Sequence, residues 1–294
     1  MPEIWPCSAR AKYSLLQADH RTRFAEKRDA FLAAARSRKT IMGILNVTPD
    51  SFSDGGRFNA PDRALAQAKK LVADGADIVD VGAESTRPGH VPISAEEEWT
   101  RLESLLEPLL ASVDAPLSID TYKAATARRA TDLGVIVVND VWGLQHDSAM
   151  ADTVAEAGAG LIVMHNRESV DPAIDIVADL RRFFDHSLDL ARRAGIPAEH
   201  IILDPGIGFG KTKEQNLAAL AATTQLQDYS LPILIGISRK SIFGALLGAS
   251  VEGRLIGTIA ANLVTAMYGA KVFRVHDPAE HRAAFTVLDA IVNA

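Results

Sequence analysis

Polar residues that can bind or activate a small molecule follow short apolar runs at many points of this sequence. The clearest case is Asp204-Pro-Gly-Ile-Gly-Phe-Gly-Lys211, which follows the apolar run Ile201–Leu203. An acid and three glycines at that point predict a buried strand that ends in a loop where bare backbone can approach a ligand. The same pattern recurs at Asn46, Glu84 to Arg87, Asp120, Asn139, His165, Lys240, Arg274 and His276. Any one of these residues is equally well explained as a helix cap or a turn residue, so the argument depends on the set.

Four members of the set have the chemistry needed to read a flat, nitrogen-rich heterocycle. Asp120 and Asp204 can each accept two parallel N–H bonds from an amidine-like edge. Asn139 supplies a donor and an acceptor together, and Lys240 can donate to a ring nitrogen or carbonyl. Because a ligand without such an edge would leave these groups unpaired, the set predicts selectivity for such a ring.

A second subset is suited to an anion. Arg87, Arg274 and His276 can bind phosphate oxygens, for which the arginine guanidinium is especially well shaped. Asn46 offers an uncharged oxygen, which suits a Mg²⁺ ion that arrives on a phosphate ligand and keeps most of its waters.

Three loops carry glycine, proline or hydroxyl residues after predicted strands. Gly206-Ile-Gly-Phe-Gly-Lys-Thr212 is not a Walker A loop, because only three residues separate its outer glycines and Pro205 stands where the first glycine belongs. Residues 48–56 and 84–89 are rich in turn formers and hydroxyl groups. Plain surface turns would explain both segments, but loops of this kind also close over active sites and exclude water.

Composition excludes several classes of protein. The chain has 294 residues, a net charge of -6 and a single cysteine, Cys7. Without a long basic tract, nucleic acid and anionic membranes are poor partners, and one cysteine excludes an intrachain disulfide. No signal peptide or membrane-spanning apolar run is evident, so we expect a cytoplasmic protein. No histidine pair has zinc-ligand spacing, and the serines lack the Gly-x-Ser-x-Gly pattern of hydrolases.

Short apolar runs alternate with helical patterns from Thr40 onward. The helical segments repeat apolar residues with a period of 3.6, as in Ala95–Leu110, whereas the runs between them are short and continuous, as buried parallel strands are. The predicted strands are Ile41–Asn46, Ile78–Val81, Leu117–Asp120, Val135–Asn139, Leu161–His165, Ile201–Asp204, Ile233–Gly236 and Val272–Val275. This count and order favour an α/β fold, a (β/α)8 TIM barrel, whose active face lies at the strand C-termini. A doubly wound open sheet is the alternative.

No linker-like stretch divides the chain, which predicts one barrel domain over residues 39–294. Residues 1–38 are predicted to be an N-terminal extension, part helix and part irregular. A solvated helix that packs on the barrel is favoured there over a binding arm.

Seven blocks of this sequence together resemble the dihydropteroate synthase family of pterin-binding TIM barrels. They are residues 41–56, 80–89, 118–121, 138–140, 204–211, 238–241 and 274–277. The first two blocks are long and specific, and the short ones also occur in other pterin-binding barrels.

The resemblance implies a Mg²⁺-dependent cytoplasmic homodimer that joins 6-hydroxymethyl-7,8-dihydropterin pyrophosphate to 4-aminobenzoate in folate biosynthesis and is a target of sulfonamides. By position, Asp120, Asn139, Asp204 and Lys240 would hold the pterin, Asn46 would meet Mg²⁺, and Asn46, Arg274 and His276 would meet the pyrophosphate. The aminobenzoate site would be shaped by Thr86, Arg87, Pro88, Ser241 and Phe52, and Asp50 would order the first loop around the metal and the leaving group. Asp120, Lys240, Arg274, His276 and Asp50 are therefore the predicted catalytic residues.

The sequence departs from the family pattern in two places. Asn166-Arg-Glu-Ser169 replaces a stretch that commonly contains methionine and glycine, and Ile207 stands where an aromatic residue is common. Neither change touches the predicted polar set.

Three other activities fit part of the pattern. A methyltransferase barrel that passes a methyl group from a reduced folate to a corrinoid protein would keep the pterin residues without the long first loop. A non-catalytic pterin-binding paralogue would not need intact loop motifs. A Schiff-base aldolase using Lys240 is disfavoured by the neighbouring Arg239.

Overall fold

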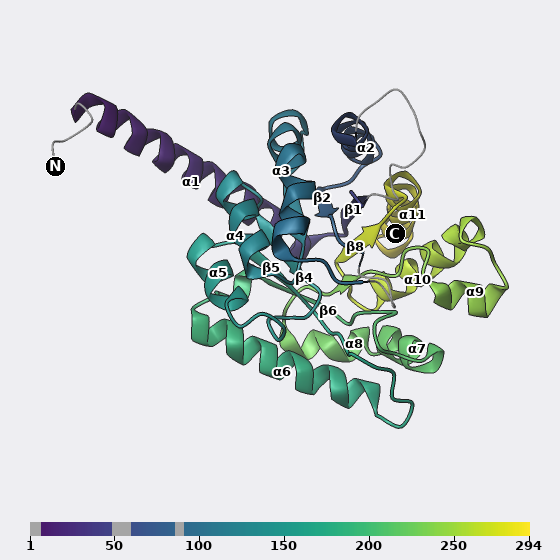
Figure 1. Ribbon diagram of the computed structural model, residues 1–294. Coiled ribbons are helices and arrows are strands. Elements are labelled where there is room, and N and C mark those ends of the chain that lie inside the picture. Colours follow the sequence, from purple (N-terminus) through teal and green to yellow (C-terminus); the bar gives the residue numbers. More distant parts are fainter. Residues whose placement is uncertain (1–6, 49–59, 86–90) are drawn as a thin grey trace.

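Eight parallel strands form a closed barrel with the helices outside it (Figure 1). The computed structural model describes residues 7–48, 60–85 and 91–294, with the side chains of its first helix from Arg21 onward. The strand order is β6-β5-β4-β3-β2-β1-β8-β7, and a parallel bridge between Leu203 and Ile233 joins the two ends of the sheet. The prediction of a (β/α)8 barrel is confirmed, and the doubly wound open sheet is excluded.

The elements alternate along the chain as the sequence predicts. The strands are β1 (Thr40–Asn46), β2 (Ile78–Gly82), β3 (Leu117–Asp120), β4 (Val137–Asp140), β5 (Gly160–Met164), β6 (Ile201–Asp204), β7 (Leu234–Ile235) and β8 (Val272–Val275). The helices are α1 (Cys7–Ser37), α2 (Ala60–Ala73), α3 (Ala95–Ser112), α4 (Ala124–Leu133), α5 (Met150–Ala157), α6 (Ile176–Ala194), α7 (Lys213–Ala221), α8 (Thr223–Leu226), α9 (Ser241–Leu247), α10 (Leu255–Met267) and α11 (Pro278–Val292). Short 3-10 turns precede β6 and follow α8, and another precedes α10.

Three elements between β6 and α10 differ from the prediction, namely β7 and the short helices α8 and α9. Strand β7 has only two residues, because the chain leaves the sheet toward Arg239, whose φ of 55° is left-handed. Helix α9 was not predicted, since seven residues give no clear helical period and its first residue follows Lys240, which makes no side-chain capping bond.

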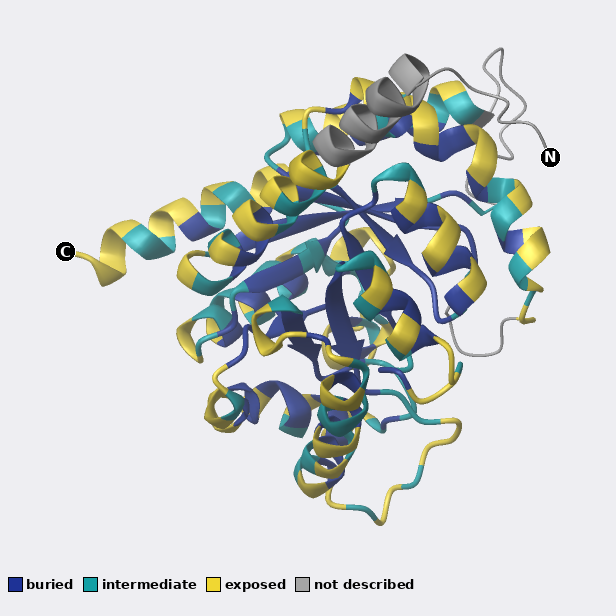
Figure 2. Cartoon of the chain, turned by 90° about the vertical axis from the view of Figure 1, so that its left-hand side faces the viewer, coloured by how far each residue is buried: buried dark blue, intermediate teal, exposed yellow. Residues whose placement is uncertain are grey.

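Side chains alternate between the two faces of each strand, and this alternation builds the barrel in layers. The outward residues of β2, Val79 and Val81, belong to the large apolar core under the helices. The inward Ile78 belongs to a second cluster, which also contains Met42, Ile136, Val137, Ile162, Ile202, Leu234 and Val272. Figure 2 shows the strands as the most buried part of the molecule, with the exposed surface on the outer faces of the helices. The inner cluster fills the barrel near the strand N-termini.

Helix α1 closes that end of the barrel. Phe31, Leu32 and Ala35 are buried in the inner cluster, with exposed fractions of 4% or less. Arg36 also donates to the carbonyl of Ala198 at 3.2 Å. The expectation of a partly irregular segment is wrong for residues 7–37, which form one continuous helix whose C-terminal part packs on the barrel.

Within the described ranges, no single helix is long and apolar enough to cross a membrane. Only α9 and the segment Glu252–Met267, bent by 81°, meet the length and composition criteria when taken as a pair.

Candidate active site

A connected group of charged and polar side chains occupies the C-terminal end of the barrel. Asp80 is fully buried and lies two residues after Ile78, so it also points inward. It accepts hydrogen bonds from the Ser118 hydroxyl at 2.6 Å and from the Asn139 amide at 3.1 Å. The Arg274 Nε donates to the same carboxylate at 2.6 Å. Four different strands therefore converge on Asp80.

Arg274 ties Asp80 to Asp120. Its Nη2 donates to Asp120 Oδ2 at 2.6 Å, so one guanidinium joins two acids. Burial raises the pKa of Asp120 to about 7, although the Arg274 charge opposes this shift and the Asp80 charge adds to it. The pKa of Arg274 stays above its usual value because Asp80 and Asp120 outweigh the cost of burial. The guanidinium is thus a fixed positive charge in the barrel.

Two buried oxygen atoms in this group have no hydrogen-bond partner within the part of the chain that the structure describes. They are Oδ1 of Asp120 and Oδ1 of Asn139. Both residues are less than 7% exposed. Because an unsatisfied buried acceptor costs roughly 1–3 kcal/mol, such atoms in a native protein call for an external donor. Asp120 and Asn139 are paired across β3 and β4, so the two oxygens come from adjacent positions.

Asp204 and Lys240 form the opposite side of this group. Asp204 Oδ1 accepts the backbone N–H of Gly206 at 2.7 Å, and burial raises the pKa of Asp204 against the opposing charge of Lys240. Lys240 donates to the carbonyl of Ile207, and burial lowers its pKa to about 8 although Asp204 opposes this. The titrations of Lys240, Asp204, Asp120 and Arg274 influence one another, so these groups share one electrostatic environment.

An apolar wall stands beside the polar group. Tyr122, Val141 and Met164 form a small cluster with Trp142 and Phe209 at the ends of β3, β4, β5 and β6. The Lys240 ammonium lies 4.4 Å from the centre of the Phe209 ring. A flat ligand between these surfaces would find an apolar face and polar edges.

The chain around Lys240 is held by specific local contacts. Arg239 Nε donates to Asp277 Oδ2 at 3.0 Å, and its backbone N–H donates to the Thr258 hydroxyl at 3.1 Å. These bonds stabilise a left-handed conformation that is unfavourable for arginine. On the neighbouring strand, His276 Nδ1 lies 2.9 Å from the Ser238 hydroxyl, which also accepts the His276 backbone N–H.

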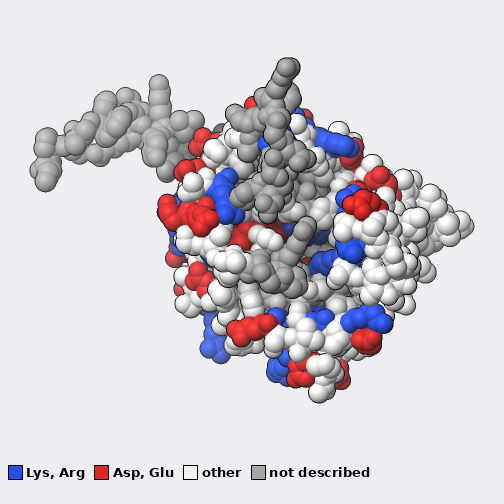
Figure 3. Space-filling model, turned by 45° about the vertical axis from the view of Figure 1, so that its right-hand side comes forward, with Lys and Arg blue, Asp and Glu red and all other residues white. Residues whose placement is uncertain are grey.

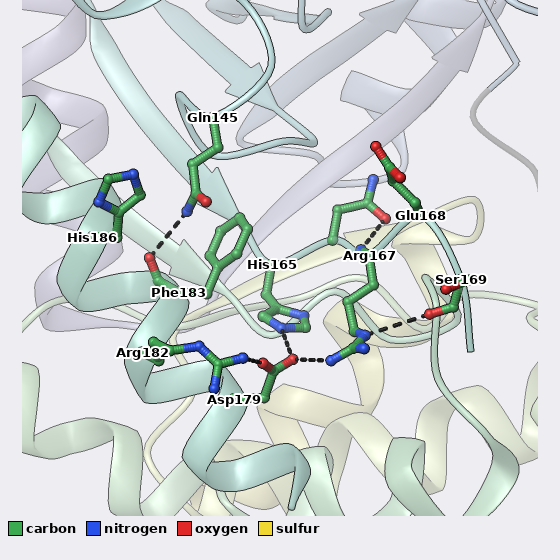
Figure 4. Close-up of a pocket in the computed structure, with 10 residues that line it drawn as sticks. Gln145, His165, Arg167, Glu168, Ser169, Asp179, Arg182, Phe183 and His186 are labelled. Atoms are coloured by element: carbon green, nitrogen blue, oxygen red, sulfur yellow. Dashed lines mark hydrogen bonds and ion pairs between the residues drawn. The ribbon is translucent and has the colours of Figure 1, made fainter. Parts of the chain in front are cut away.

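Two pockets adjoin the group. A pocket of about 200 Å³ lies between the β6 loop and α9 and is lined by Ile207, Lys211, Asn216, Lys240 and Ser241, among others. A larger one of about 510 Å³ lies beside His165 and against α6 (Figure 4). The smaller pocket is lined by two of the predicted ligand-binding residues, Lys240 and Ser241, whereas the lining of the larger one contains none of them.

Comparison with known proteins identifies the family. Residues 42–276 match the model of the family described as pterin binding enzyme. The dihydropteroate synthase of Clostridium beijerinckii is 44% identical over 256 residues, which cover 87% of this chain and 95% of that protein. The chain belongs to the pterin-binding enzyme family.

Solved structures of the family agree in fold. Dihydropteroate synthase of Xanthomonas albilineans with 4-aminobenzoic acid is 39% identical, with a TM-score of 0.85 and coverage of 88% of this chain and 94% of that one. The same enzyme in complex with 7,8-dihydropteroate is 37% identical, with a TM-score of 0.81 and coverage of 88% and 95%. The predictions of the family and of an enzyme of the dihydropteroate synthase class are confirmed. These relatives do not favour the methyltransferase, the non-catalytic pterin-binding paralogue or the aldolase.

The structure brings together most of the residues predicted for a pterin-binding enzyme. Asp120, Asn139, Asp204, Lys240 and Arg274 share the barrel end described above. Asn46 ends β1 and is half-buried, and Ser241 begins α9 and is exposed. Asp50, Phe52, Thr86, Arg87 and Pro88 lie outside the described residues. The roles assigned to all these residues remain predictions.

Sequence reasoning missed two charged residues of the site. Asp80 lies inside an apolar strand, where a carboxylate must be paired, and that position was the signal that could have found it. Lys211 was noted only as the last residue of the Asp204–Lys211 segment and was given no role, yet it is 7% exposed, and burial lowers its pKa to about 7. Its partners come from distant parts of the chain, so spacing alone could not reveal them.

Proposed function

We propose that this pterin-binding enzyme joins 6-hydroxymethyl-7,8-dihydropterin pyrophosphate to 4-aminobenzoate at the C-terminal end of its barrel. The products are 7,8-dihydropteroate and pyrophosphate. The observation that carries this proposal is the pair of buried oxygens on Asp120 and Asn139, which have no partner among the described residues and lie in one group with Asp204 and Lys240. The amino and ring N–H groups of a pterin would supply the missing donors.

The proposed pterin contacts follow from the donor and acceptor inventory. Asp204 has one oxygen engaged with Gly206, so its second oxygen is available to accept from a ring or amino N–H. Asn139 uses its amide N–H on Asp80 and presents its carbonyl oxygen to the ligand. Lys240 would donate to the ring carbonyl or a ring nitrogen. The apolar cluster around Met164 would pack on the ring face.

Arg274 and His276 would receive the pyrophosphate. Asp80 and Asp120 hold the Arg274 guanidinium through two of its five N–H donors, which fixes its plane at the barrel end. His276 is positioned by Ser238 one strand away. Positive charge fixed before the reaction stabilises the negative charge that develops on the leaving group without later rearrangement.

The residues described at this end fit a Mg²⁺ ion that is carried mainly by the substrate. Among the described residues, no three His, Cys, Asp or Glu side chains are grouped as a metal site. Asn46, with a neutral oxygen donor at the end of β1, would add one ligand to those of the pyrophosphate. When bound, the ion would supply further positive charge to the departing pyrophosphate.

The chemical step that suits this site is a dissociative substitution. The bond between the pterin methylene carbon and the pyrophosphate oxygen breaks, and its electron pair leaves with pyrophosphate. The electron-rich pterin spreads the positive charge left at the methylene, and Asp120 in its ionised form favours that cation. The amine nitrogen of 4-aminobenzoate then forms the new C–N bond and loses a proton. No protein nucleophile is needed, so no covalent adduct should be trapped during turnover.

A pyrophosphate-release assay tests the proposal. With the pterin pyrophosphate, 4-aminobenzoate and Mg²⁺ present, we expect release that depends on all three and is competed by a sulfonamide. Release at an equal rate without 4-aminobenzoate, or no release with a folded protein, would contradict it. Methyl transfer from a reduced folate in place of release would favour the methyltransferase alternative.

We also propose that the enzyme is a homodimer formed through α10 and α11. The exposed positions of α10 fall on one stripe with apolar side chains only: Ile256, Ala260, Val264 and Met267. On α11, which packs beside it, Val287 and Ile291 are 59% and 69% exposed. Figure 3 shows a broad area without charged side chains on the side of the molecule that carries α9 and α10. Apolar patches of this kind in soluble proteins mark protein interfaces.

The oligomer is tested by analytical ultracentrifugation. The wild type should sediment as a dimer, and Met267→Glu combined with Ile291→Glu should give a folded monomer. A wild-type monomer at micromolar concentration would contradict the homodimer. A cytoplasmic location, which the single cysteine accommodates, is part of the same proposal and can be checked by cell fractionation.

A further inference from the structure

Lys211 is a buried basic residue that the proposed chemistry does not use. Its Nζ lies 2.7 Å from the carbonyl oxygen of Gly206, 3.1 Å from that of Phe209 and 2.8 Å from His165 Nδ1. An ammonium group has three donors, so these three acceptors account for all of them. Two of the acceptors belong to the loop between β6 and α7. Lys211 therefore fastens that loop to the residue that follows β5.

His165 connects Lys211 to helix α6 through hydrogen bonds. Its ring is fully buried, and burial lowers its pKa to about 3, so the imidazole is neutral. Because Nδ1 accepts from Lys211, Nε2 carries the proton and donates to Asp179 Oδ2 at 3.1 Å. Asp179 also accepts from Arg167 Nη1 at 2.7 Å. Figure 4 shows His165 and Arg167 reaching one oxygen of the Asp179 carboxylate, with Arg182 at the other.

The loop held by Lys211 in turn sets two predicted pterin contacts. The Gly206 N–H binds Asp204, and the Ile207 carbonyl binds Lys240. The loop also packs tightly, because a Cβ at Gly206 would lie 1.8 Å from the His165 carbonyl oxygen. A Cβ at Gly210 would lie 2.4 Å from Arg167 Cβ. A shift of the loop would therefore move Asp204 and Lys240 together.

We propose that Asp179, His165 and Lys211 form a positioning chain that holds the β6 loop, and with it Asp204 and Lys240, in the geometry that binds the pterin. Lys211 is a positioning residue, because the three donors of its ammonium group are engaged by the loop backbone and His165, although its side chain also lines the smaller pocket. This inference rests on the proposed pterin site. It concerns the pterin half, since the residues predicted for 4-aminobenzoate, apart from Ser241, come from other parts of the sequence, at positions 52 and 86–88.

Substitutions that break the positioning chain should therefore affect the binding of the two substrates differently. We expect Lys211→Met and His165→Leu to weaken the affinity for the pterin pyrophosphate by about 10- to 100-fold, the range seen when residues that orient a binding group are lost. The KM for 4-aminobenzoate should change by less than about 3-fold. A residue with a purely structural role would affect both substrates or only the stability.

Comparing a variant that keeps the hydrogen bonds of His165 with one that loses them separates their effect from that of side-chain volume. His165→Gln can accept from Lys211 through its carbonyl oxygen and donate to Asp179 through its amide, so it should restore most of the affinity that His165→Leu loses. Arg182→Ala is the matched control, because Arg182 pairs with the same carboxylate but is 76% exposed and has no contact with the loop. Its pterin affinity should stay within about 2-fold of the wild type.

Isothermal titration with the pterin pyrophosphate, together with the KM values of both substrates, gives the readout, and circular dichroism verifies folding. Equal losses for the two substrates, or equal affinities of His165→Gln and His165→Leu, would overturn the positioning chain. If Lys211→Met does not fold, the comparison of His165→Gln, His165→Leu and Asp179→Asn decides. Failure of the wild type to bind the pterin pyrophosphate would instead reject the proposed function.

Discussion

At the scale of single residues, the site depends on which inward-facing positions are polar. Ile78 and Asp80 face the same side of β2, and Val137 and Asn139 the same side of β4. The first residue of each pair packs in the inner apolar cluster, and the second joins the polar group two positions later. The inward faces of these strands therefore change from apolar residues, at the barrel end closed by α1, to polar residues at the binding site.

The first prediction concerns Asp120. Asp120→Asn keeps the shape of the side chain and removes the negative charge that favours the pterin cation. We expect kcat to fall by about 100-fold, while the affinity for the pterin pyrophosphate changes by less than about 3-fold. Steady-state kinetics and calorimetry on the same preparation measure both quantities. An equal loss in kcat and affinity would argue against a role in the transition state.

A second prediction concerns the charge of Lys240, whose pKa burial lowers to about 8. The hydrogen-bond donor is the protonated amine of Lys240. The protonated fraction is complete well below pH 8 and is lost as the pH rises through that value. The kcat/KM for the pterin pyrophosphate should therefore fall above about pH 8. In Lys240→Arg the cation persists, so that alkaline fall should disappear even if the maximum is lower. An unchanged alkaline fall in the arginine variant would assign it to another group.

At the scale of elements, the loop after β6 shows how glycines allow a close approach. Gly206, Gly208 and Gly210 all have left-handed φ values, of 63°, 87° and 57°. Thr212 and Gln215 then form a capping box that starts α7. The loop is thus fixed by its backbone conformation at one end and by a helix cap at the other, while Lys211 fastens its middle.

The third prediction tests that close approach. In Gly206→Ala, the new methyl group would lie 1.8 Å from the His165 carbonyl oxygen. We expect kcat/KM for the pterin pyrophosphate to fall by about 100-fold or more, because the loop must move away from Asp204. Gly195→Ala is the control: its φ is also left-handed, at 85°, but nothing lies within 4 Å of the new methyl group.

The control should lose only about 1 kcal/mol of unfolding free energy, from backbone strain, and should keep its activity. Similar kinetic losses in the two variants would mean that strain, rather than contact with His165, explains the effect. Urea unfolding and initial rates measure the two responses.

The elements themselves were largely predictable. The helical period and the continuous apolar runs locate all eight strands, since buried parallel strands and amphipathic helices differ in both length and period. The polar strand ends predict a shared site once a barrel is assumed. The sequence could not reveal which distant side chains contact each other. Nothing in the spacing shows that Arg274 meets Asp80, 194 residues away, or that Lys211 meets His165. Such contacts depend on barrel closure.

At the scale of the whole molecule, α1 acts as the floor of the barrel. Phe31, Leu32 and Ala35 are buried against strand residues such as Met42 and Val272. The segment was predicted as an extension in which a solvated helix packs on the barrel, but its helical pattern gave no indication of which surface it covers. In the structure the barrel interior has a polar binding end and an apolar end closed by this helix.

The fourth prediction is that this closure contributes to stability rather than to catalysis. Leu32→Ala should lower the unfolding free energy by about 2–5 kcal/mol, since Leu32 is 4% exposed and lies in the inner cluster. The KM values of the folded enzyme should not change. Glu26→Ala, on the exposed side of the same helix, should change stability by less than about 0.5 kcal/mol. Altered KM values in Leu32→Ala would show that the floor also shapes the site.

The most direct test of the pterin site is the affinity of Asp204→Asn for 6-hydroxymethyl-7,8-dihydropterin pyrophosphate, measured by calorimetry. The substitution keeps the side-chain volume and replaces one acceptor oxygen by a donor. Because a pterin N–H would then face another N–H, we predict that binding weakens by at least about 30-fold in a fully folded protein. Unchanged affinity in such a variant would contradict the assignment of this barrel end as the pterin site.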